Sequence, residues 1–168
     1  MTYIFPTAIL TGLLATSAIA PASYADTFMT STVKAKTKKW SPPIRSFKLK
    51  APFAPGKYNW NAGHRGLDIQ GSANIPVTAP ASGIVYFKGK IAEKTTLSIQ
   101  HEGDIRSTYE PVISTLKKGD YVTKGQVIGY LLPGGHCNFC LHFGVKTTEK
   151  YLNPLLFLNI QRSILLPR

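Results

Sequence analysis

Two short segments of this sequence combine residue types that bind metals. In the first segment, His64 and Asp68 lie four positions apart with Gly66 between them. In a straight strand their Cα atoms would be roughly 13 Å apart, so the two side chains would barely meet on one ion. A bend at Gly66 would bring them together. Alone, this pair fits a surface histidine beside a structural aspartate as well as it fits a metal site.

The second segment reads CLHFGV over residues 140–145. Cys140 and His142 are two positions apart, so they share one face of a strand, while the apolar residues between them face a core. A histidine on such a strand needs a partner, either a metal ion or a backbone group. Two segments with complementary ligand types in one short chain favour a metal centre.

The elements that must position these residues are β-strands. From about residue 46 onward, runs rich in Val, Ile, Tyr and Phe alternate with glycine-containing turns. This spacing predicts an all-β fold, a single antiparallel sandwich or barrel-like domain. Asn153 and Pro154 predict the N-cap and first residue of a short helical turn. Strands are expected at residues 67–69, 84–87, 96–99, 106–109, 127–131 and 141–145.

The N-terminal 25 residues predict export. Residues 1–25 contain no charged side chain, and the apolar run 9–20 is too short to span a bilayer. Small residues at 23 and 25 match a cleavage site, so we expect a signal peptide rather than a frayed tail or an uncleaved anchor. The mature protein would be secreted, extracellular or wall-associated, without a membrane span, and a monomer.

The charge of the chain is strongly positive. Its 168 residues carry 20 Lys and Arg against 8 Asp and Glu, a net charge of +12. Residues 26–45 are basic and rich in Thr, Ser and Pro, which predicts a flexible linker before a β domain at 46–160 and a tail at 161–168. The linker is either a solvated tail or a tether to an acidic polymer outside the cell. Nucleic acid is not expected as a partner of an exported protein.

Cys137 and Cys140 are the two cysteines of the chain. An even number outside the cell favours a disulfide, which would remove Cys140 from metal binding and proton transfer. Free structural thiols and thiolate metal ligands, the latter in a zinc knuckle with His136, remain open. No thioredoxin-like βαβ pattern surrounds the pair to indicate a redox motif.

Several motifs follow one another in the order of a known family. They are HRGLD at 64–68, APASGIV at 79–85, KGDYVTKGQVIG at 118–129 and LHF at 141–143. Over roughly residues 60–146 the chain resembles the lysostaphin-like zinc endopeptidases of peptidase family M23, bacterial enzymes that cut the peptide cross-links of peptidoglycan.

The resemblance implies an antiparallel β domain of the duplicated hybrid motif type with one bound zinc ion (Zn²⁺). It also implies that His64, Asp68 and His142 are the metal ligands. Three protein ligands leave one position open for water, as catalytic zinc sites require.

The chain departs from the family pattern at two positions. Active members usually read His-x-His in the last motif, where the first histidine assists the water or the oxyanion; here Cys140 takes its place. A second assisting histidine usually ends a Tyr-x-His element, which here reads Tyr109-Glu110-Pro111. The proline side chain cannot transfer a proton. The resemblance therefore implies either another catalytic arrangement or a zinc-binding fold without hydrolysis.

Four residues are candidates for the missing catalytic groups. His136 ranks first, because it lies in a glycine-rich loop just before the site, although it also fits an ordinary surface histidine. Cys140 could act as a thiolate ligand or base, Glu110 as a carboxylate base and Tyr109 as an oxyanion donor. We expect His101 to be structural.

Three functions remain open at this point. The first is an exported zinc metalloendopeptidase that hydrolyses peptide cross-links of peptidoglycan during wall remodelling. The second is a degenerate relative that binds peptidoglycan or another anionic wall polymer, or regulates a wall hydrolase, without cutting. The third is a hybrid-motif carrier related to lipoyl and biotinyl domains, against which the expected export and the metal-binding residues argue.

Overall fold

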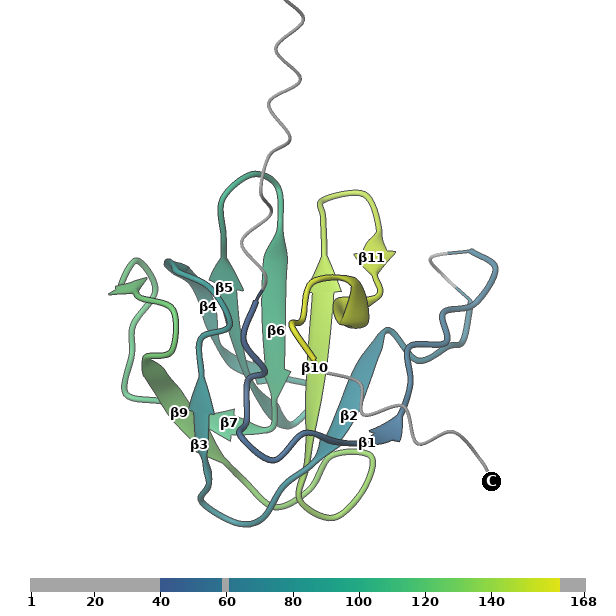
Figure 1. The fold of residues 1–168 in the computed structure, drawn as a ribbon, viewed down its shortest axis with the longest axis horizontal. Helices are drawn as coiled ribbons and strands as arrows, with labels where there is room; N and C mark the ends of the chain where they lie inside the picture. The colour runs from purple at the N-terminus through teal and green to yellow at the C-terminus, as the bar shows by residue number, and fades with distance from the viewer. Residues whose placement is uncertain (1–39, 59–60, 161–168) are drawn as a thin grey trace, which may run out of the picture. The chain divides into compact units, whose positions relative to one another are not determined.

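A computed structural model of the chain describes residues 40–58 and 61–160 (Figure 1). The described residues belong to the compact unit Thr37–Arg168, one of two units into which the chain divides. Their elements in chain order are β1 (Lys48–Ala51), β2 (Gly66–Gln70), β3 (Pro76–Thr78), β4 (Gly83–Ile91), β5 (Lys94–Gln100), β6 (Arg106–Glu110), β7 (Val112–Ile113), β8 (Tyr121–Val122), β9 (Val127–Leu131), β10 (Cys140–Lys146), β11 (Tyr151–Leu152) and the 3₁₀ helix η1 (Pro154–Leu156).

The strands form two antiparallel sheets. The main sheet has eight strands in the order β1-β2-β10-β6-β5-β4-β8, and β11 pairs with β10 beside this path. The small sheet has the order β3-β9-β7. Figure 1 shows β10 at the centre of the main sheet, between β2 and β6. The predicted all-β antiparallel fold is confirmed.

The two faces of the main sheet have opposite character. The register places Asp68 of β2 opposite His142 of β10, and His142 opposite Glu110 of β6, so these side chains share one face. We call this the polar face. The other face packs into the core with fully buried side chains, among them Leu67, Ile69, Leu97, Tyr109, Leu141 and Phe143. Each strand therefore supports the core and the polar face with alternate residues.

The predicted elements agree with the structure. All six expected strands are present, and the expected helical turn is η1. Its N-cap is Asn153, whose side chain accepts a hydrogen bond from the Leu155 backbone N–H at 3.0 Å, and Pro154 is the first helical residue. Among the described residues, no helix is long and apolar enough to cross a membrane.

The β domain begins earlier than residue 46. Trp40 and Ile44 are buried in the core, and the Trp40 indole contacts the rings of His101 and Phe157. Residues 40–45 therefore belong to the β domain rather than to the predicted linker, because burial removes the large apolar side chains of Trp40 and Ile44 from water. The predicted signal peptide (1–25), the rest of the linker and the tail (161–168) lie outside the described residues.

Replacing Ile44 by alanine tests this boundary. Because Ile44 is 2% exposed, we expect Ile44→Ala to lower the free energy of unfolding by about 2–5 kcal/mol. The matched control is Ile113→Ala, where the side chain is 54% exposed and the expected loss is below about 1 kcal/mol. Urea unfolding measures both changes. Equal losses for the two variants would show that residues 40–45 do not belong to the domain.

Candidate metal centre

The pairing of β2 with β10 brings the two predicted segments together. Asp68 and His142 are direct cross-strand neighbours. His64 precedes β2 and is held by a two-way backbone bridge with Ala54, with N···O distances of 2.8 and 2.9 Å. These constraints place three side chains from two distant parts of the sequence at one point of the polar face.

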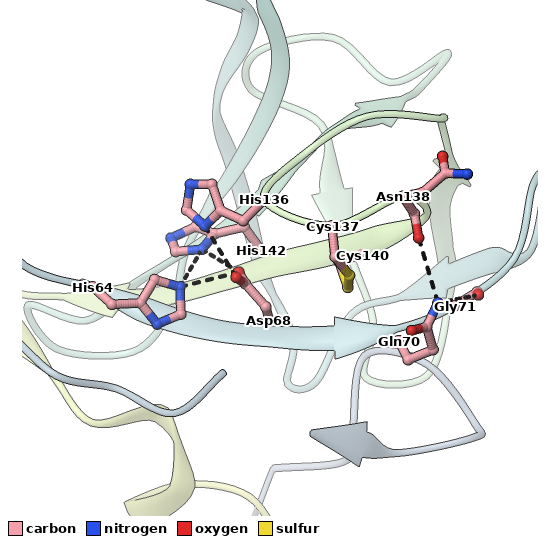
Figure 2. The surroundings of a disulfide bond; sticks show 9 residues. All are labelled: His64, Asp68, Gln70, Gly71, His136, Cys137, Asn138, Cys140 and His142. Carbon is pink, nitrogen blue, oxygen red and sulfur yellow. Dashed lines mark hydrogen bonds and ion pairs between the residues drawn. A yellow bond between two sulfur atoms is a disulfide. The ribbon is translucent and has the colours of Figure 1, made fainter. Parts of the chain in front are cut away.

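Four side chains converge there, as Figure 2 shows. The Asp68 Oδ1 atom lies 2.8 Å from His142 Nδ1 and 3.1 Å from His64 Nε2. The other carboxylate oxygen, Oδ2, lies 3.0 Å from His136 Nδ1. One ligand atom from each residue lies within 4.8 Å of all the others. The structure thus brings His136 to the three ligands that the resemblance implies.

The His64 ring is oriented by a backbone carbonyl. Its Nδ1 lies 2.6 Å from the Pro52 carbonyl oxygen, so Nδ1 carries the proton and donates it there. The other nitrogen, Nε2, then presents a lone pair toward the centre. Such an outer hydrogen bond fixes the tautomer of metal-binding histidines. Nothing in the sequence around Pro52 indicated this role, because it depends on a contact between distant backbone segments.

Gly66 has a role other than the predicted bend. It lies in the regular strand β2, and a Cβ atom there would be 2.7 Å from His142 Nε2. Only a residue without a side chain leaves room for the His142 imidazole at this point. The glycine is thus explained by the close approach of the ring rather than by backbone freedom.

A disulfide-closed loop carries His136. Cys137 and Cys140 are bonded, with their Cα atoms 5.3 Å apart, and the Cys140 N–H also donates to the Cys137 carbonyl. Gly134 and Gly135 have positive φ values and turn the chain just before His136. Figure 2 shows the disulfide beside the histidine cluster. The disulfide that we predicted from the expected export of the chain is present. It anchors Cys137, the residue after His136.

Two of the predicted catalytic candidates are engaged in other interactions. Cys140 is fully buried and disulfide-bonded, so it has no thiolate to bind metal or take a proton. Tyr109 points to the core face of β6, packs against Phe143 and bonds to the Ser107 hydroxyl at 2.7 Å. Burial raises the pKa of its phenol far above the ordinary value. The structure therefore argues against both residues as catalytic groups.

Glu110 lies on the polar face, but its carboxylate contacts residues outside the metal-binding cluster. It is the cross-strand neighbour of His142, and its carboxylate contacts Lys94 Nζ at 3.2 Å and accepts from the Thr96 hydroxyl at 3.1 Å. It is not part of the four-residue cluster. Its carboxylate is thus occupied by Lys94 and Thr96 and does not face the cluster of His64, Asp68, His136 and His142.

His101 is structural, as predicted. It is 7% exposed, and its ring nitrogens contact the Ser82 carbonyl at 2.9 Å and the Ser107 hydroxyl at 2.7 Å. Burial lowers its pKa, so the neutral ring is favoured. His101 therefore belongs to a buried polar network with Tyr109, on the side of the main sheet away from the metal centre.

The Asp68 carboxylate is ionised over a wide pH range. Burial by itself raises its pKa, but the hydrogen bond and charge of His142, and then those of His64, outweigh burial and lower the pKa from 3.8 to about 2. A buried carboxylate surrounded by three imidazoles is a set of N and O donors, the types that Zn²⁺ binds. The His64 and His142 nitrogens lie 3.2 Å apart around the same oxygen. The residues present therefore fit a zinc ion.

The fold and this cluster together define a β-rich domain with a candidate metal centre. The model for Peptidase family M23 matches residues 62–154, more than half of the chain. The chain belongs to peptidase family M23, which confirms the resemblance found in the sequence.

Similar proteins and structures agree with this assignment. Uncharacterized proteins of Mycobacterium tuberculosis and Mycobacterium bovis are 37% identical over 123 residues, which is 68% of this chain and 47% of theirs. The chain thus spans about half the length of these relatives. The catalytic domain of the antimicrobial peptidase lysostaphin from Staphylococcus simulans is 26% identical with a TM-score of 0.59, covering 68% of this chain and 93% of that one. Helicobacter pylori Csd3 is 27% identical with a TM-score of 0.62, covering 74% and 36%.

The pKa of Asp68 predicts an acid-dependent contribution to stability. A carboxylate whose pKa is lowered by folding stabilises the protein above its ordinary pKa, and this contribution is lost as the pH falls through the folded value. Zinc-free wild type should therefore be more stable than Asp68→Asn by roughly 2 kcal/mol near pH 5, and the difference should vanish toward pH 2. Urea unfolding with a chelator present, repeated across this range, measures it. A difference that does not change with pH would contradict the assigned interactions.

Proposed function

We propose that this protein is an exported zinc metalloendopeptidase that hydrolyses peptide cross-links of peptidoglycan. The observation that carries the proposal is the convergence of His64, Asp68 and His142 on the polar face, with His136 beside them. The family assignment supports a peptidase. The uncharged N-terminal segment, which lies outside the described residues, supports export.

Zinc would be held by His64 Nε2, one Asp68 oxygen and His142 Nδ1, the atoms that face one another in the structure. When bound, zinc would polarise the scissile carbonyl and make water a stronger nucleophile at neutral pH. Asp68 supplies the negative charge that partly balances the ion. The Pro52 carbonyl keeps the proton of His64 on Nδ1, away from the metal side.

His136 is the candidate for proton transfer. Its side chain is 46% exposed, so it can reach a substrate, and its ring centroid lies 5.0 Å from that of His142. With Nδ1 directed at Asp68, its Nε2 can take a proton from the attacking water and return it to the leaving amine.

The loop that carries His136 passes next to the two positions at which active family members carry their assisting histidines. A Cβ on Gly135 would be 2.9 Å from the Cys140 carbonyl oxygen and 3.4 Å from Pro111 Cδ. Cys140 and Pro111 occupy the two positions at which active members carry those histidines. This proximity supports His136 as the group that replaces the missing histidines.

The second candidate is a domain that binds peptidoglycan, or regulates a wall hydrolase, without cutting. The absence of a histidine at both Cys140 and Pro111 favours it. In this case His136 would be a fourth metal ligand, and four protein ligands make a closed, structural zinc site. The two proposals differ in whether His136 leaves a position open at the metal.

Two variants separate the candidates. His64→Ala should lose both zinc and hydrolysis, because it removes a ligand. His136→Ala should keep one zinc per chain and lose hydrolysis by about 10²–10⁴-fold, because it removes the proton-transfer group. Release of new amine termini from purified cross-linked peptidoglycan measures activity, and native mass spectrometry measures zinc.

Asn138→Ala is the matched control, because Asn138 is an exposed residue of the same loop and contributes its backbone carbonyl to the Gln70 contact. It should behave as wild type. An inactive wild type that holds one zinc would support the binding domain instead. A fully active His64→Ala variant would rule out the zinc peptidase.

The disulfide should matter for activity rather than for metal content. In Cys137→Ser/Cys140→Ser, Asp68 and His142 remain on the paired strands β2 and β10, and His64 remains bridged to Ala54. His136 alone loses its anchor. We expect unchanged zinc stoichiometry and a loss of hydrolysis of about tenfold or more, since small misplacements of catalytic groups are costly. Equal activity of the double variant and wild type would show that the loop is positioned without the disulfide.

A further inference from the structure

An apolar groove lies at the rim of the core, beside the edge strand β1. It measures about 250 Å³, and the residues that line it are all apolar: Phe47, Leu49, Leu155, Leu158 and Ile160. Sites for small molecules are usually larger, about 300–1,000 Å³, and combine apolar walls with a few polar groups. This groove therefore suits apolar side chains of a polypeptide better than a small ligand.

Leu49 marks a part of the core face that the described residues leave incompletely covered. Its cross-strand partner on β2 is the fully buried Ile69, so Leu49 points to the core face of the main sheet. It is nevertheless 38% exposed. Among the described residues, β1 pairs with β2 on one side and ends the strand order on the other. Proteins usually cover or charge an edge strand that exposes apolar side chains, because it can pair with another chain.

The chain itself leads into the groove from its C-terminal side. Ile160 lines the groove, and the residues before it are held in place: Leu158 is buried, and the Asn159 N–H donates to the Trp40 carbonyl at 2.8 Å. Residues 161–168, which lie outside the described residues, read QRSILLPR. An apolar run therefore begins at Ile164, four positions after Ile160 and at most about 14 Å from it.

The segment that precedes Trp40 is a poorer occupant of the groove. Residues 31–39 read STVKAKTKK, with four lysines. The strand β1 already exposes Lys48 and Lys50, and like charges repel. The run at residues 164–166 is uncharged and apolar, so its chemistry matches the lining of the groove.

We propose that Ile164, Leu165 and Leu166 dock into this groove and cover Leu49, so that the C-terminal segment completes the rim of the core. The tether through Ile160 gives the run a high effective concentration at the groove, so a few apolar contacts are enough to hold it. The groove is on the core side of β1, so docking leaves the polar face and the metal centre open. The proposal therefore stands or falls independently of the peptidase activity.

A double-mutant cycle tests the docking. Ile164→Ser/Leu165→Ser/Leu166→Ser should lower the equilibrium constant for folding about tenfold or more, because burial of one leucine side chain contributes about that much. Leu49→Thr keeps a strand-forming residue and removes the apolar wall of the groove. In the Leu49→Thr background the serine changes should lower the constant by less than about threefold, because their contact is already lost. Urea unfolding of the full chain measures all four proteins.

The matched control background is Leu156→Thr. Leu156 is 80% exposed and does not line the groove, so the serine changes should keep their full effect there. An equal effect of the serine changes in the Leu49→Thr and Leu156→Thr backgrounds would overturn the docking. Serine changes that leave the stability of the wild type unchanged would overturn it as well.

Trypsin cleavage after Arg162 gives a second readout that does not require the serine variant to fold. Docking restricts access of the protease to this bond, so cleavage follows the population of undocked chains. Mass spectrometry should show that Leu49→Thr loses residues 163–168 about tenfold or more faster than Leu156→Thr. Equal rates would overturn the proposal. Equal rates together with dimerisation that Leu49→Thr abolishes, measured by analytical ultracentrifugation, would assign the groove to a second copy of the chain instead.

Discussion

The antiparallel pairing of β2 with β10 is the constraint on which the site depends. It places Asp68 opposite His142, and the same register places Ile69 against Leu141 and Leu67 against Phe143 in the core. A slip of one residue would exchange the two faces, burying a carboxylate and exposing apolar side chains. Core packing therefore also fixes the geometry of the metal centre, because alternate residues of the same two strands point to the core and to the site.

Much of the fold could be predicted because its signals are local. The alternation of apolar residues gave the six expected strands, and the Asn153-Pro154 pair gave the start of η1. Two motifs with complementary ligand types indicated a metal centre, and the family resemblance implied its three ligands; the structure brings these residues together with His136. Because successive residues of a strand face opposite sides, Tyr109 and Glu110 of β6 could not both serve one site, and the sequence alone indicates this.

The remaining features depend on contacts between distant segments. Trp40 lies in a basic, proline-containing stretch that predicts a linker, yet it packs against His101 and Phe157. The Pro52 carbonyl that orients His64, and the proximity of the His142 ring to Gly66, arise from tertiary packing alone.

The first and last described segments are joined to each other. Trp40 pairs with Leu158 in a parallel bridge, with Trp40 N–H donating to the Phe157 carbonyl at 2.9 Å and Asn159 N–H to the Trp40 carbonyl at 2.8 Å. A domain whose two ends meet can be carried as a module, because flanking sequence on either side attaches at one place without crossing the sheets. The mycobacterial relatives, about half of whose length this chain spans, are consistent with such modular use. The bridge between Trp40 and Leu158 thus holds the two ends of the described domain side by side.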